Sequence, residues 1–262
     1  MRTEDPSVKV LGKAGRLLTE LGERSDLTVR ELSLRLGEPR PTVHRILQGL
    51  AALGYVEAGS KGGTYRLGFE LFRLGSAAVR GIDVRDAAAP VLQDIHAELE
   101  ETVYLTIQRG HDAVCIDRIE GLHIRSMFLQ LGGAMPLHLG AGPRALLANL
   151  PRAYWEEYLD AVPLTPLTPA SPTRREEVLE LLDEALRDGH ALSDEDVTMG
   201  IASVGAPIFG ATGKVIAAVS VGGLSALILG PERRDLVIEL VTGGARRISE
   251  AMGYRTPVLP PA

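Results

Sequence analysis

The sequence contains a single cysteine, Cys115, which excludes an intrachain disulfide. No apolar run is long enough to cross a bilayer, and the first residues lack a signal-peptide core, so we expect a cytoplasmic protein with no membrane partner. The six histidines form no H-x-x-x-H pair, and there is no cysteine pair that would complete a zinc site. A G-x-S-x-G nucleophile motif and a complete phosphate loop are also absent. We therefore expect no catalytic residue, no metal and no cofactor.

Positive charge is scarce, but it is unevenly distributed. The chain carries 28 Lys and Arg against 34 Asp and Glu, a net charge of −6, which is unusual for a protein that binds nucleic acid. Residues 1–80 nevertheless hold 13 basic and 9 acidic residues, whereas residues 81–262 hold 15 and 25. The positive potential is thus concentrated in the first segment, where phosphate groups would need it.

Residues 28–67 predict two short helices, a tight connection and a hairpin. Thr28 and Glu31 have the spacing of a capping box for the first helix, which Gly37 ends. The second helix begins near Arg40, and its apolar residues fall on one stripe of a helix: Val43, Ile46, Leu47, Leu50 and Leu53. Two alternating segments then flank a tip at residues 60–62. With a further helix over residues 8–24, this order is typical of a winged helix-turn-helix.

Polar side chains gather on the other face of the second predicted helix, near its N-terminus. Such side chains can donate to phosphates, and Arg and Gln can also read base edges in the major groove. We therefore predict double-stranded DNA as a partner, contacted by Thr28, Arg40, Thr42, His44, Arg45, Gln48 and, on the wing, Lys61.

The remaining chain predicts a linker and a second domain. We expect a winged domain over residues 1–67, a linker helix over 68–82 and a second domain over 83–262. The linker helix has two apolar faces, one for the winged domain and one for a partner copy; a plain linker helix is the alternative. In the second domain we predict four helices, over residues 84–100, about 143–160, 173–188 and 231–253. For the third of these, Thr173 is the predicted cap, with Glu176 three residues further on. Strands are predicted over 102–110, 112–119, 124–132, 190–197, 200–210 and 214–223. Antiparallel hairpins covered by helices indicate the α+β class.

Several segments, in one order, resemble the IclR-type transcriptional regulators over almost the whole chain. They are LTVRELSLRLGEPRPTVHRILQGLAALGYV, YRLGFELFRLG, RIEG, PLHLGAGPRALLA, DEDVTMGIASVGAPIF and GKVIAAVSVGG. The resemblance implies a winged helix-turn-helix, a linker helix, and a C-terminal domain of the GAF/profilin-like sort that binds a small-molecule effector. It also implies a dimer, or a dimer of dimers, on a pseudo-palindromic operator.

Carried over position by position, the resemblance places the effector at Leu129, Ala141, Gly142, Ser193 or Asp194, Ser203, Phe209, Ser220 and Gly222. Ala141 and Gly142 precede a helix, whose free N–H groups favour an anion such as an organic acid. The chain departs from members that bind small 2-oxo acids, because it has Ser193, Ser203 and Gly222 where those have an acid, a Cys and a Ser. We therefore expect a larger and less polar acid, such as an aromatic one.

Other interpretations of the same residues remain open. The second domain is alternatively a small-molecule-binding or hydrolytic enzyme-like domain, with the helix-turn-helix used for protein interaction. The acids of SDEDV, residues 193–197, are interpreted as a solvated, helix-capping loop, and His138 as a neighbour of the presumed effector site. Cys115 is predicted to be a core residue, with a redox sensor as the alternative.

Overall fold

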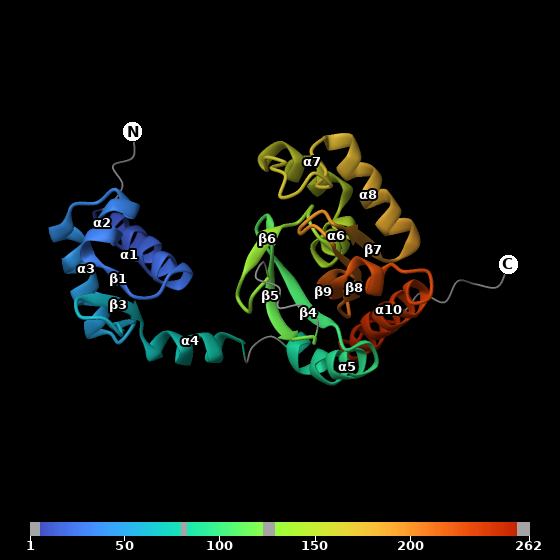
Figure 1. The fold of residues 1–262 in the computed structure, drawn as a ribbon, viewed down its shortest axis with the longest axis horizontal. Helices are drawn as coiled ribbons and strands as arrows, with labels where there is room; N and C mark the ends of the chain where they lie inside the picture. The colour runs from blue at the N-terminus through green and yellow to red at the C-terminus, as the bar shows by residue number, and fades with distance from the viewer. Residues whose placement is uncertain (1–5, 80–82, 123–128, 256–262) are drawn as a thin grey trace. The chain divides into compact units, whose positions relative to one another are not determined.

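The computed structural model describes residues 6–79, 83–122 and 129–255, and the chain divides into two compact units, Met1–Gly81 and Ile82–Ala262 (Figure 1). The helix that we predicted as a linker, α4 (Phe69–Val79), is grouped with the first unit. Within the described ranges, no helix is both long and apolar enough to cross a membrane.

The first unit is the winged helix-turn-helix that the sequence predicted. Its helices are α1 (Pro6–Glu23), α2 (Val29–Leu36) and α3 (Arg40–Ala52), and its small sheet has the order β1 (Leu27–Thr28), β3 (Thr64–Leu67), β2 (Val56–Ala58). Leu17, Leu32 and Leu47 have no exposed surface and join the three helices in one core. Strand β1 was not predicted, because two residues are too few to show an alternating pattern.

The predicted capping box at the start of α2 is present. The Thr28 hydroxyl accepts from the Glu31 N–H, and the Glu31 carboxylate accepts from the Thr28 N–H at 2.8 Å. Gly37 ends the helix with a φ of +65°, a conformation that glycine adopts without strain. Helix α2 is therefore fixed at both ends by local chemistry.

The second unit is built on a six-stranded antiparallel sheet with the order β6-β5-β4-β9-β8-β7. The strands are β4 (Thr102–Arg109), β5 (Asp112–Ile119), β6 (Ala134–Pro136), β7 (Ala191–Asp194), β8 (Ile201–Phe209) and β9 (Val215–Leu224). The helices are α5 (Asp83–Leu99), α6 (Ala141–Ala148), α7 (Arg152–Ala161), α8 (Arg175–Asp188), α9 (Ser225–Ile228) and α10 (Arg234–Ala251). The α+β class is thereby confirmed.

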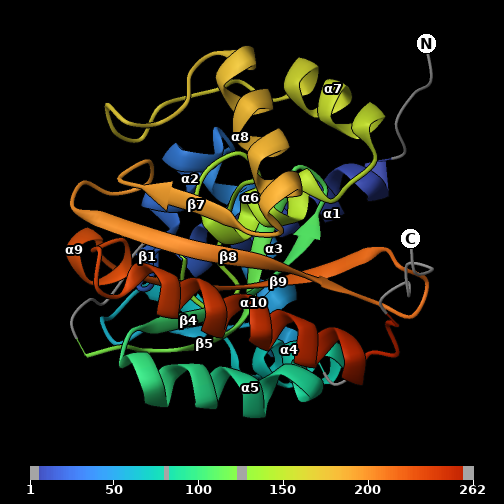
Figure 2. The same cartoon turned by 90° about the vertical axis from the view of Figure 1, so that its right-hand side faces the viewer.

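Helices cover both faces of this sheet (Figure 2). Helices α5 and α10 pack together on one face, where apolar side chains of every long strand form the larger core. Helices α6 and α8 lie over the other face, with Trp155 and Tyr158 of α7 completing a second core. The cavity described below lies on this second face, because its wall is formed by α6.

Several predicted boundaries were wrong. The single helix predicted from about 143 to 160 is two helices, α6 and α7, with Pro151 just before the second. Residues 129–132 form a bend and a turn, and the third strand is the short β6; the other residues of that predicted strand, 124–128, lie outside the described part. The turn follows from Gly132, which has a φ of +78°. Helix α8 begins at Arg175, and the carboxylate that accepts from the Thr173 and Arg174 N–H groups belongs to Glu177, not Glu176. Helix α9 was not predicted.

Candidate functional sites

The polar residues predicted to contact DNA lie along the outward face of α3. Its buried side chains are Val43, Ile46, Leu47 and Leu50, which pack on α1 and α2. Exposed side chains occupy the opposite face: Arg40, His44, Arg45 and Gln48, with Thr42 partly exposed. Helix α3 thus separates an apolar face that holds it in the unit from a polar face that is open to a partner.

Some basic residues of the first unit form ion pairs, and others have no acidic partner among the described residues. Lys13 and Arg16 both bind Glu38, and Arg35 and Arg66 each bind a glutamate. In contrast, five exposed basic residues have no acidic partner within the described residues: Arg24, Arg30, Arg40, Arg45 and Lys61. Three of these, Arg40, Arg45 and Lys61, were predicted to contact DNA; Arg24 and Arg30 were not, because sequence alone does not show which cations are neutralised.

The wing is anchored to the start of α2. Asp26 accepts from the Ser60 N–H at 2.6 Å, from the Ser60 hydroxyl at 2.8 Å and from the Thr64 hydroxyl at 3.3 Å. These hydrogen bonds lower the pKa of Asp26, and the bond from the Ser60 hydroxyl has the largest effect. They hold the tip that carries Lys61. Thr28 differs from the other predicted DNA contacts, because its hydroxyl is already engaged with Glu31.

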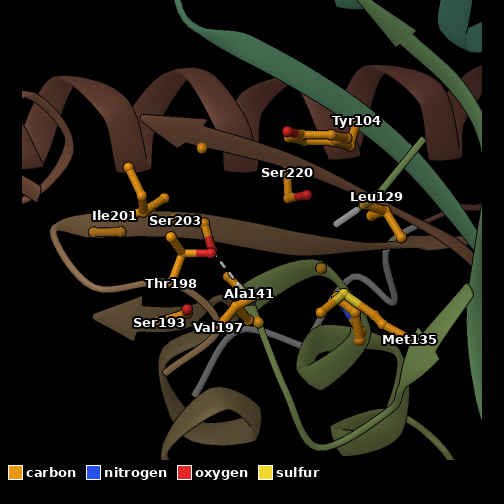
Figure 3. A pocket seen from close by; sticks show the side chains of 15 residues that line it. Tyr104, Leu129, Met135, Ala141, Ser193, Val197, Thr198, Ile201, Ser203 and Ser220 are labelled. Carbon is orange, nitrogen blue, oxygen red and sulfur yellow. Dashed lines mark hydrogen bonds between the residues drawn. The ribbon is translucent and has the colours of Figure 1, made fainter. Parts of the chain in front are cut away.

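The second unit contains a cavity of about 80 Å³ between α6, the sheet and the segment after β7 (Figure 3). Seven of the nine predicted effector residues line it: Leu129, Ala141, Gly142, Ser193, Ser203, Ser220 and Gly222. The sequence did not predict the other lining residues, most of which are apolar: Tyr104, Met135, Gly140, Pro143, Val197, Thr198, Ile201 and Ala202.

Two predicted residues, Asp194 and Phe209, do not line this cavity. Asp194 follows Ser193 in β7, and because successive strand residues point to opposite faces, only Ser193 reaches the cavity. Phe209 lies at the far end of β8, about 20 Å from Ser203 at the usual rise of a strand. Its ring packs on Tyr254, with the ring centroids 5.1 Å apart.

Glycines let α6 approach the sheet closely enough to form the cavity wall. A Cβ on Gly205 of β8 would lie 2.5 Å from the Ala141 carbonyl carbon and 2.6 Å from the Gly142 nitrogen. A Cβ on Gly142 would lie 2.8 Å from the Ser220 hydroxyl oxygen. Any side chain at these positions would push α6 away from the strands that carry the serines.

Hydrogen-bond donors face the cavity near the start of α6. Ala141 donates its N–H to the Ser203 hydroxyl at 3.2 Å, and Pro143 has no N–H, which leaves the Gly142 N–H as the donor of this first turn. Ser220 is 4% exposed, and its hydroxyl has no partner among the described residues. This arrangement suits an anion held by neutral donors.

A buried ion pair supports the wall. Arg144 of α6 donates to Asp196, to the Leu192 carbonyl and to the His138 carbonyl, and both charged side chains are at most 5% exposed. The interpretation of residues 193–197 as a solvated loop was therefore wrong at Asp196. His138 does not line the cavity; its Nδ1 contacts the Tyr158 hydroxyl at 2.7 Å.

His138 predicts a loss of stability in mild acid. Burial, and then the charge of Arg144, lower its pKa to about 4, whereas an unfolded histidine titrates near 6.5. Protons therefore bind the unfolded chain preferentially between these values, and stability present above pH 6.5 is lost as the pH falls towards 4, by roughly 3 kcal/mol. Urea unfolding followed across this range should show the loss. A His138→Gln variant with an undiminished slope would contradict this assignment.

Cys115 is buried beside the cavity, with no exposed surface. Burial raises the pKa of its thiol to about 11, and the thiol donates to the Asp117 carbonyl at 3.3 Å. Because the thiolate is the reactive form, these surroundings favour the core role over the redox-sensor alternative.

Comparisons with known proteins agree with this architecture. Residues 10–59 match the IclR helix-turn-helix domain, and residues 76–250 match the bacterial transcriptional regulator IclR C-terminal domain. The HTH-type transcriptional repressor AllR of Klebsiella pneumoniae is 32% identical over 231 residues, which cover 87% of this chain and 84% of AllR. The crystal structure of Thermotoga maritima IclR has a TM-score of 0.76 at 29% identity and covers 94% of this chain and 100% of that one.

A second solved structure shows the same fold. It is an IclR homologue from Microbacterium hydrocarbonoxydans complexed with 4-hydroxybenzoate, with a TM-score of 0.80 at 24% identity, covering 93% of this chain and 98% of that one. Both halves of the chain match one family in the expected order. The chain therefore belongs to the IclR family of transcriptional regulators, with an N-terminal helix-turn-helix and a C-terminal effector domain.

Proposed function

We propose that the cavity binds a short-chain organic acid, which controls the binding of the winged unit to DNA. The observation that carries this proposal is the set of neutral donors at one end of an otherwise apolar cavity, namely the Gly142 N–H and the Ser203 and Ser220 hydroxyls. An organic acid, 4-hydroxybenzoate, occupies the homologue from Microbacterium hydrocarbonoxydans, which supports this class of ligand.

The size of the cavity favours a smaller acid than the aromatic one expected from the sequence. Its volume of about 80 Å³ is little more than half of the roughly 150 Å³ of an apolar protein cavity that takes up benzene. The Tyr104 ring takes up part of the space that Gly222 leaves open, because it lies 3.5 Å from where a Cβ on Gly222 would stand. A chain of three or four carbons therefore suits the site better than a ring.

The DNA contacts that we propose are Arg40, Thr42, His44, Arg45 and Gln48 of α3, Lys61 of the wing, and Thr28 and Arg30 at the start of α2.

Helix α4 supports self-association: the Phe69 and Phe72 rings lie 5.5 Å apart, and these residues are 70% and 67% exposed. A dimer, or a dimer of dimers, would place two such units on a pseudo-palindromic operator. This role implies a cytoplasmic protein.

We infer binding rather than catalysis in the cavity. A serine hydrolase needs a base in contact with its nucleophile. The Ser203 hydroxyl instead accepts from the Ala141 N–H, and neither Ser203 nor Ser220 contacts a histidine in the part of the chain that is described. These contacts favour the regulator over the enzyme-like alternative.

A thermal-shift measurement on the full chain tests the effector site. Binding to the folded state alone adds about 2.7 kcal/mol at a ligand concentration 100 times its Kd. We expect at least one acid from a panel of two- to six-carbon carboxylates to raise the Tm, and Ser203→Leu to abolish the shift by filling the cavity. Ser25→Leu, at an exposed serine of the other unit, should keep it. If no acid shifts the Tm, or if Ser203→Leu keeps the shift, the proposed site is wrong.

A further inference from the structure

One wall of the cavity is polarised by a residue that does not line it. Asp196 is 3% exposed, and both of its oxygens are engaged: one accepts from the Ser193 hydroxyl, and the other accepts from Arg144 and, at 3.3 Å, from the Gly140 N–H. As a carboxylate paired with Arg144, Asp196 can only accept. The Ser193 proton is therefore committed to Asp196, and Ser193 presents only lone pairs to the cavity.

The neighbouring wall has the opposite polarity. The Ser203 hydroxyl accepts from the Ala141 N–H, so its own proton is available to the cavity. Ser220, on the next strand, adds a second hydroxyl without a partner in the described chain. Ser193 and Ser203 are directly paired across β7 and β8, and Ser203 pairs with Gly222 of β9. Acceptor and donors therefore lie in adjacent strands on the same face.

This arrangement selects a ligand by its hydrogen-bond polarity. We propose that Asp196 is a specificity-determining residue that makes the cavity select hydroxycarboxylic acids, with the carboxylate on Ser203 and Ser220 and the hydroxyl donating to Ser193. The inference rests on the proposed function of the cavity. A carbonyl or a second carboxylate at the hydroxyl position would place an acceptor oxygen opposite the acceptor lone pairs of Ser193. Both buried groups would then lack a hydrogen-bond donor.

The spacing of the two walls indicates where the hydroxyl belongs. Directly paired strand residues have Cβ atoms about 4.5–5.5 Å apart. In a 3-hydroxy acid two carbon atoms separate the carboxylate from the hydroxyl oxygen, which spans a comparable distance, whereas in a 2-hydroxy acid only one carbon separates them; a 3-hydroxy acid therefore fits better.

Three four-carbon acids that differ only at C3 test the proposal: butyrate, 3-hydroxybutyrate and acetoacetate, titrated into the full chain by calorimetry. We expect 3-hydroxybutyrate to bind about 10-fold more tightly than butyrate, and acetoacetate to bind no more tightly than butyrate. In Ser193→Ala the three affinities should lie within about two-fold of one another. In Asp196→Asn, the amide can donate to the Ser193 hydroxyl and thereby free the Ser193 proton for the cavity. The affinity for acetoacetate should therefore rise relative to that for 3-hydroxybutyrate. If Asp196→Asn does not fold, the comparison with Ser193→Ala still decides.

Each outcome bears on one claim. Equal affinities for the three acids in the unchanged protein would overturn the role of Asp196 and leave the effector site standing. A preference for 3-hydroxybutyrate that persists in Ser193→Ala would also overturn it. If none of the three binds although another carboxylate raises the Tm, the cavity does not select hydroxycarboxylic acids, and the effector site still stands. If no carboxylate binds in the calorimetry or raises the Tm in the thermal-shift measurement, the proposed effector site is wrong as well.

Discussion

Replacing Arg144 with methionine should lower the free energy of unfolding of the second unit by about 3–5 kcal/mol, because it leaves a buried carboxylate without its partner. Arg144 binds Asp196 and two backbone carbonyls, and its side chain is 3% exposed. Methionine has a similar length but no donor. Asp196 would keep only the Ser193 hydroxyl and the Gly140 N–H, which cannot balance a buried charge.

The matched control is Arg247→Met. Arg247 binds Asp94 at 2.7 Å, but both side chains are more than half exposed, so its loss should cost at most about 1 kcal/mol. Urea unfolding of the three proteins, followed by tryptophan fluorescence, measures the difference, because the single Trp155 lies in the second unit. Adding Asp196→Leu to Arg144→Met should restore part of the stability, since an apolar pair removes the unpaired charge. Equal losses in the Arg144 and Arg247 variants would show that the buried pair is not important for stability.

The same ion pair illustrates what the sequence could not predict. Helix and strand periods report where apolar residues recur, so they predicted the winged unit, the hairpins and most helices. Asp196 follows two other acids, and nothing in that run distinguishes a buried acid from solvated ones. Its burial depends on Arg144, which is 52 residues away in the chain. Long-range pairing of this kind is invisible to local patterns.

The cavity was only partly predictable for a related reason. The predicted polar positions came from the family resemblance, and strand alternation then separates Ser193, which faces the cavity, from Asp194, which does not. The apolar lining came from segments far apart in the sequence, with Tyr104 on β4 and Ile201 on β8. Cavity volume depends on how such side chains meet, which the sequence does not show. The sequence therefore suggested an aromatic acid, whereas we propose a smaller one.

Removing Arg40 and Arg45 together should weaken DNA binding roughly 100-fold or more, because each arginine that reads a base edge contributes about 1–3 kcal/mol. Both side chains are exposed on the outward face of α3, and neither has an acidic partner among the described residues. Alanine favours a helix, and the core face of α3 is untouched, so the winged unit should stay folded. Lys61→Ala should cost less and should lower the salt slope by about one, since a lysine acts as a point charge on a phosphate.

Gel shifts with the upstream region of the gene, at two or more salt concentrations, measure these effects. The control is Arg187→Ala, which removes an exposed arginine of α8 that already binds Asp188 and should leave DNA affinity unchanged. A double Arg40 and Arg45 variant that binds DNA as tightly as the unchanged protein would refute α3 as the recognition helix. Equal weakening by Arg187→Ala would instead indicate that affinity follows net charge. Only a loss that is largest in the α3 variant, smaller in Lys61→Ala and absent in Arg187→Ala supports a wing and a recognition helix that act together on one duplex.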